Sequence, residues 1–124
     1  MQTKILGSFF AFIFGLMLLS SCAKDTLVNE PSNINPDQPV SFSTQIQPIF
    51  TGSCIGCHGG TFAPDLREGK AYADLMATNC IDTLNPTNSL LYKVMAPGGS
   101  MANYCTKDQA DLTLVWIQQG AKNN

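Results

Sequence analysis

The 124-residue sequence contains one histidine, one tryptophan and only seven lysine and arginine residues. It has no basic patch of the kind that binds nucleic acid. No stretch alternates apolar and polar residues as a half-buried strand does, and no segment repeats. These shortages argue against a nucleic-acid partner and against a β-sheet or repeat architecture, and they favour a small all-α domain.

The longest apolar run lies near the N-terminus and is too short to span a bilayer. Lys4 precedes an almost wholly apolar stretch over residues 5–19, which is followed by two serines. A membrane-spanning helix needs about 20 such residues. The pattern therefore predicts an export signal over residues 1–21.

The end of this signal, "LSSC", resembles the lipobox of bacterial lipoproteins. The resemblance implies cleavage before Cys22 and lipidation of that cysteine, which would hold the chain on a membrane. The alternative is an ordinary secretory signal beside a coincidental cysteine. Cleavage would leave 103 residues with six Lys and Arg against nine Asp and Glu, a net charge of −3 and enough chain for one small domain.

The remainder divides into a linker and a domain. Residues 22–40 include three prolines, many polar residues and no apolar period. This composition predicts a lipidated, flexible tether, with a structured N-terminal arm as the alternative. The folded domain is expected over residues 41–124.

Four helices are expected in the domain. The first has Ser43 as N-cap, with Ile46, Ile49 and Phe50 on one face and Pro48 in the first turn. The second covers residues 69–77 and the third residues 85–95, with inward residues Tyr72, Leu75 and Met76, and Leu90, Leu91 and Val94, respectively.

The last helix has the strongest local signals. Thr106 and Gln109 form a capping box, and Gly120 is expected to end the helix. Leu112, Val115 and Trp116 form its apolar stripe. Four short helices give a thin core for about 80 residues, so a disulfide, metal or cofactor is expected to complete it.

The motif "SCIGCHGG" at residues 53–60 is a candidate for that role. A zinc site could combine Cys54 and Cys57 with Cys80 and Cys105, but it would leave His58 unused. A thioredoxin-like dithiol needs a βαβ context that the sequence does not show. Covalent haem explains the whole motif, because two thiols add to the vinyl groups and the next histidine coordinates iron.

The chain resembles the small class I c-type cytochromes, particularly the single-haem domains of bacterial lipoproteins. The resemblance covers roughly residues 42–122 and rests on "IQPIFTGSCIGCHGG", "NPTNSLLYKV", a glycine-rich loop with a methionine, and "LVWIQQGAK". It implies an all-α cytochrome c-like fold wrapped around one haem c, with the first and last helices packed across each other. It also implies thioether bonds at Cys54 and Cys57 and an axial iron ligand at His58.

The sixth iron ligand is expected to be a methionine, because a single histidine cannot supply both axial positions. Met76, Met95 and Met101 remain after cleavage of the signal. Met76 and Met95 fit apolar helical patterns, whereas Met101 follows "PGGS" in a loop. The family's ligand lies in such a loop before the final helix, so Met101 is the first choice and Met95 the second.

Two further cysteines, Cys80 and Cys105, are expected to pair in an exported protein. The bridge would close a 26-residue loop around Met101. Two free buried thiols are the alternative.

These features predict a membrane-anchored electron carrier that works with redox partner proteins and is not itself an enzyme. No small-molecule substrate and no nucleic acid is indicated. The location expected is the periplasmic or cell-surface face of a bacterial membrane, most simply the outer membrane. The alternatives are a haem-bearing electron-entry subunit of a specific exported oxidoreductase and a haem-based sensor of small ligands.

Overall fold

The computed structural model describes residues 32–124, so the expected export signal and Cys22 lie outside the described residues. In the described part every regular element is helical and no strand is present, which confirms the all-α class. The elements are η1 (Phe42–Ile46), α2 (Gln47–Ser53), α3 (Ala71–Ala77), η2 (Pro86–Asn88), α4 (Leu90–Met95), η3 (Ala102–Tyr104) and α5 (Lys107–Gln118). None of the helices within residues 32–124 is long and apolar enough to cross a membrane.

The first helical segment begins earlier than expected and with a different hydrogen-bonding period. Ser41, and not Ser43, caps it by accepting from the Thr44 N–H at 3.4 Å. Its first turn, η1, is a π-helix, and α2 continues directly from it with Pro48 in its first turn. That position suits Pro48, since the first amides of an α-helix have no intrahelical acceptor.

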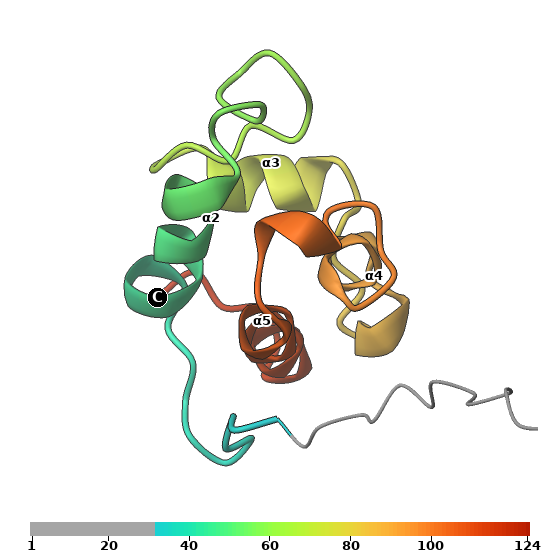
Figure 1. Ribbon diagram of the computed structural model, residues 1–124. Coiled ribbons are helices and arrows are strands. Elements are labelled where there is room, and N and C mark those ends of the chain that lie inside the picture. Colours follow the sequence, from blue (N-terminus) through green and yellow to red (C-terminus); the bar gives the residue numbers. More distant parts are fainter. Residues whose placement is uncertain (1–31) are drawn as a thin grey trace, which may run out of the picture. The chain divides into compact units, whose positions relative to one another are not determined.

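The C-terminal residue contacts the start of the first helical segment. Main-chain and side-chain oxygens of Asn124 accept from the N–H groups of Ser43 and Phe42, at 2.8 and 3.0 Å. These bonds satisfy free donors at the start of η1. Figure 1 shows the marked C-terminus lying against this first segment.

The core is built where η1 meets α5. The ring of Phe42 lies 5.2 Å from that of Trp116 and 5.4 Å from that of Tyr72, between centroids. The Trp116 indole N–H is satisfied by the carbonyl of Lys122 at 2.9 Å. Aromatic pairs at these separations add to the stabilisation from burial. The expected packing of the first helical segment on the last is thus present, through η1.

The last helix follows its sequence signals closely. The Thr106–Gln109 capping box has both of its hydrogen bonds, and Gly120 has a φ of +95° just after the C-cap. A positive φ suits glycine, which has no Cβ to clash. Trp116 and Val115 are buried as expected, while Leu112 is half-buried.

The two middle helices are shorter than expected. The third splits into η2 and α4, and its buried residues are Leu91 and Met95, whereas Leu90 is 53% exposed. In α3, Leu75 is buried as expected, and Tyr72 and Met76 are half-buried. In the view of Figure 1, α2, α3 and α4 follow one another in an arc around α5.

Part of the expected tether is docked on the domain. Gln119 accepts from the Val40 N–H at 2.8 Å and donates to the carbonyls of Gln38, at 2.8 Å, and Pro36, at 3.1 Å. The Val40 side chain is 5% exposed. The folded part therefore begins before residue 41, and residues 36–40 form a strap fixed to the end of α5.

Candidate functional site

A single cavity of about 400 Å³ gathers the residues singled out by the sequence. Its walls are the end of α2 with the cysteine motif, residues 63–66, α4, and the loop through η3. The lining side chains are Phe50, Ser53, Cys54, Cys57, His58, Ala63, Pro64, Leu66, Cys80, Leu90, Leu91, Val94, Met95, Ser100, Met101, Tyr104 and Cys105. This volume and this mainly apolar lining are typical of a small-molecule or cofactor site.

The two cysteines of the motif and His58 lie on one helical turn. The N–H of Cys54 donates to the Phe50 carbonyl at 2.8 Å, and that of His58 donates to the Cys54 carbonyl at 2.9 Å. The turn therefore continues from α2 and presents all three side chains to the cavity. Cys54 is half-buried and Cys57 is exposed.

The His58 ring is oriented by a main-chain acceptor. Its Nδ1 lies 3.1 Å from the carbonyl oxygen of Pro64. Because a carbonyl only accepts, Nδ1 must carry the proton and the neutral ring has its lone pair on Nε2. A second bond, from the Leu66 N–H to the His58 carbonyl at 2.7 Å, ties the same segment to the motif. The ring is thus prepared to use Nε2 as a metal ligand.

Gly59 is required for this turn to fold. A Cβ placed on Gly59 would lie 2.6 Å from the main-chain oxygen of Ile55. Gly60 follows with a φ of +96°. A side chain at Gly59 would therefore clash with the main chain of the same turn, and one at Gly60 would strain the backbone.

Two of the three candidate methionines reach the cavity. Met101 lines it from the loop before η3 and is 38% exposed, and its N–H donates to the Val94 carbonyl at 2.8 Å. Met95 lines it from α4 and is 5% exposed. Met76 is half-buried against the core and is not among the lining residues. The choice of Met101 stays a prediction, with Met95 as its competitor.

The expected disulfide is not formed in the structure. Cys80 and Cys105 both line the cavity, but both are free thiols. The sulfur of Cys80 lies 3.2 Å from the Thr78 hydroxyl, and that of Cys105 donates to the Met95 carbonyl at 3.4 Å. Each thiol thus has a polar partner of its own, main-chain hydrogen bonds such as that from the Leu91 N–H to the Cys80 carbonyl at 3.1 Å hold the segment between them, and their pairing stays a prediction.

Two of the thiols on the cavity wall, those of Cys54 and Cys105, are poor nucleophiles as they stand. Burial raises the pKa of Cys54, and the nearby Cys105 raises it further. Burial also raises the pKa of Cys105. A raised thiol pKa keeps the sulfur protonated, which is unlike the lowered pKa of a reactive dithiol.

The two other interpretations of the motif lack support in the described residues. No group of three His, Cys, Asp or Glu side chains within residues 32–124 is placed to hold a metal ion. The CxxC sequence lies at the C-terminal end of α2, whereas a redox dithiol depends on a helix N-terminus to lower its pKa.

Some lining residues were not identified from the sequence. Pro64 has no local signal, because its role depends on the fold bringing it to His58. Helical periodicity places Leu90 on the apolar face of a core helix, but its side chain lines the cavity. Tyr104 is 59% exposed at the rim.

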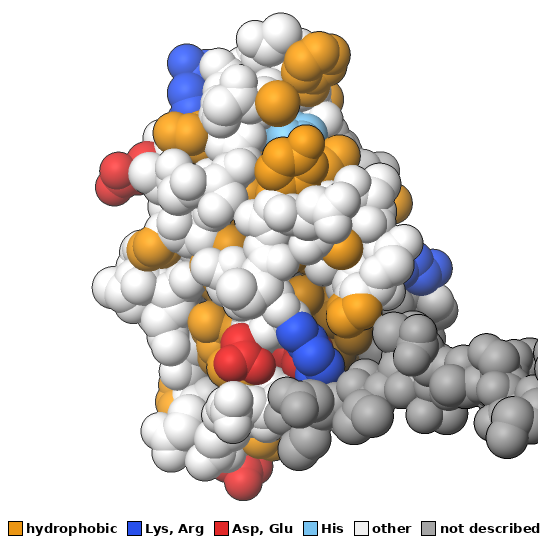
Figure 2. All heavy atoms as spheres, in the orientation of Figure 1, with side chains coloured by type: hydrophobic (Ala, Val, Ile, Leu, Met, Phe, Trp, Pro, Cys, Tyr) orange, Lys and Arg blue, Asp and Glu red, His pale blue; other side chains and the backbone are white. Residues whose placement is uncertain are grey.

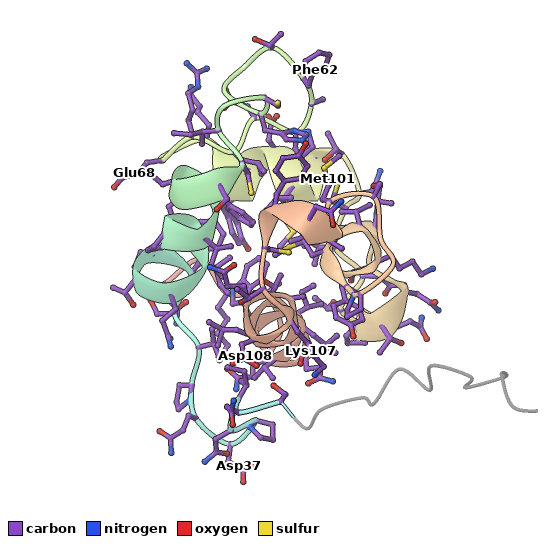
Figure 3. The ribbon with its side chains drawn as sticks, in the orientation of Figure 1. Asp37, Phe62, Glu68, Met101, Lys107 and Asp108 are labelled. Atoms are coloured by element: carbon purple, nitrogen blue, oxygen red, sulfur yellow. The ribbon has the colours of Figure 1, made fainter. Side chains whose placement is uncertain are left out.

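Figure 2 shows hydrophobic side chains gathered beside the single histidine on this face of the domain. Figure 3 places Phe62, which is 62% exposed, in the loop that follows the motif, and Met101 beside η3. Comparisons of this chain with protein-family models, with curated proteins and with solved structures gave no match.

Proposed function

We propose that this protein is an exported, lipid-anchored c-type cytochrome that binds one haem c covalently and passes electrons between redox partner proteins. The observation that carries the proposal is the convergence of Cys54, Cys57, His58 and Met101 on one apolar cavity. These four residues come from two segments more than 40 positions apart in the chain. When bound, haem supplies a one-electron Fe(III)/Fe(II) couple.

The donor set fits the group. Cys54 and Cys57 would each form one thioether bond, and the turn that carries them also carries His58. The Pro64 carbonyl holds the His58 ring with Nε2 available for iron. Met101 or Met95 can offer a thioether sulfur from the segments across the cavity.

The rest of the lining favours electron transfer over catalysis. Among the lining residues no side chain is Asp, Glu, Lys or Arg, so none of these groups is available to transfer protons. Leu91, Val94 and Met95 instead form an apolar part of its wall. Burial and methionine ligation both act on the reduction potential, and methionine raises it.

The experiment that tests the proposal is haem retention. The full chain, expressed with a c-type haem attachment system, should keep its haem through denaturation and acid–organic extraction. The Cys54→Ala, Cys57→Ala double variant should lose that haem. Release of free haem from the wild-type chain would contradict covalent attachment.

A haem-based sensor is a second candidate, and the exposure of Met101 favours it. At 38% exposed on a loop, the Met101 side chain could be displaced by a small ligand. Rapid carbon monoxide binding to the reduced wild-type protein would support the sensor, whereas slow or absent binding supports the carrier. Stable co-purification with one oxidoreductase would support a subunit role.

A further inference from the structure

One peptide group near the site is hydrogen-bonded on both sides to side chains. Its carbonyl, from Pro64, accepts from Nδ1 of His58 at 3.1 Å. Its N–H, from Asp65, donates to Oδ2 of Asp74 at 2.7 Å. Because the carbonyl of Pro64 and the N–H of Asp65 belong to the same planar group, Asp74 and His58 are the two ends of one chain of hydrogen bonds.

Hydrogen bonds in such a chain polarise one another. A carboxylate that accepts from the N–H side increases the negative partial charge on the carbonyl oxygen, which then accepts more strongly from His58. Carboxylates that accept directly from a metal-bound imidazole fix the ring and raise its basicity. Here the same effect would reach the ring through a peptide group.

The segment that carries this peptide group is also held from α2. Nε2 of Gln47, a residue that is 6% exposed, donates to the Leu66 carbonyl at 3.0 Å. Asp74 belongs to α3 and does not line the cavity. Side chains of two helices therefore hold residues 64–66, the segment whose Pro64 carbonyl orients His58, and neither side chain lines the cavity.

We infer that Asp74 is a positioning residue: through the Pro64–Asp65 peptide group, its carboxylate sets the orientation and the electron-donating strength of the His58 ring. The inference rests on the proposed function for its effect on iron, but the hydrogen-bond chain itself does not depend on bound haem.

The first test is the reduction potential of the haem-loaded full chain. Asp74→Ala removes the acceptor and keeps a residue that favours helix. A less basic His58 stabilises Fe(III) less, so the potential should rise. A tenfold loss in the preference of His58 for Fe(III) over Fe(II) corresponds to a rise of about 59 mV.

Two control variants separate the effect of the Asp74 hydrogen bond on the reduction potential from the effect of its charge. Asp74→Asn removes the charge but keeps an oxygen that can accept from Asp65, so it should shift the potential by less than half as much as Asp74→Ala. Arg67→Ala removes an exposed cation whose ion pair with Asp65 is 2.6 Å long, and it should lower the potential or leave it unchanged. Equal shifts in Asp74→Ala and Asp74→Asn would overturn the inference, because charge alone would then explain both.

The second test needs no haem. His58 is the only histidine, so the ¹⁵N signals of its ring are unambiguous in the full chain. The neutral ring should carry its proton on Nδ1 in the wild type and in Asp74→Asn, and should shift toward Nε2 protonation in Asp74→Ala. An unchanged tautomer in Asp74→Ala would refute the inference even if the chain binds haem. If the tautomer shifts as expected in Asp74→Ala but the wild-type chain never takes up haem, the inference stands and only the proposed function is refuted.

Discussion

Replacing Gly99 by alanine would place a methyl group against the last turn of α4. The added Cβ would overlap the main-chain oxygens of Lys93 and Val94, and these atoms cannot rotate away as a side chain could. The loop must therefore move, and the 2.8 Å hydrogen bond from the Met101 N–H to the Val94 carbonyl would be lost or lengthened.

The expected cost is about 2 kcal/mol of unfolding free energy. Loss of one hydrogen bond lowers the free energy of unfolding by about 1 kcal/mol. The backbone movement that relieves the main-chain overlap lowers it by about as much again. In a domain of this size, about 2 kcal/mol lowers Tm by roughly 8–16 °C. The same loop movement should weaken the bond from the Met101 sulfur to iron.

Thermal unfolding measures the loss of stability. The weak methionine-to-iron absorption band of the oxidised protein measures the bond from the Met101 sulfur to iron. Gly52→Ala is the matched control, because a Cβ at Gly52 in α2 meets no atom within 4 Å. Alanine should stabilise that helix by about 0.5–1 kcal/mol and leave the band unchanged. If Gly99→Ala left both Tm and the band at wild-type values, the reasoning from the close contact would be refuted.

Three further predictions concern the iron ligand, the anchor and an exposed ion pair. Met101→Ala should remove the methionine-to-iron band and lower the reduction potential, whereas Met95→Ala should keep the band; the reverse result would transfer the ligand role. Cys22→Ser should move the haem-loaded domain from the membrane fraction to the soluble fraction, and retention on membranes would point to another anchor. Hydrogen bonds from Arg67 lower the pKa of Asp65 to about 2, so the pair should stabilise the fold above about pH 4 and lose this effect as pH falls toward 2. In Arg67→Ala, an NMR titration should return the pKa of Asp65 toward its ordinary value, and an unchanged pKa would contradict the role of Arg67.

Local signals predicted the helices best. The capping box at Thr106 and the stop at Gly120 depend on residues within one or two turns, and the structure has both as expected. The first helix shows the limit of such signals, since two serines lie two positions apart and only Ser41 caps. The π-turn that follows has no sequence signature of its own.

Tertiary arrangement explains what the sequence could not predict. Helical periodicity shows that Leu90 lies on an apolar face, but not that this face lines a cavity. The hydrogen bond from His58 to Pro64 forms because the chain folds back after the motif and brings Pro64, six positions later, next to the His58 ring. The composition of residues 36–40 indicates a linker, yet the Gln119 side chain, about 80 positions away in sequence, binds three of their main-chain groups.

Docking of the strap on α5 has a consequence for where electrons can be delivered. If Cys22 holds the lipid, only about thirteen residues lie between it and the strap, and they span at most about 45 Å when fully extended. In Figure 3, Asp37 of the strap and Phe62 near the site lie at opposite ends of the domain. A tether of this length confines the domain to a thin layer above the lipid surface. Its encounters would then be a two-dimensional search among neighbours in the same membrane, and not diffusion across a compartment.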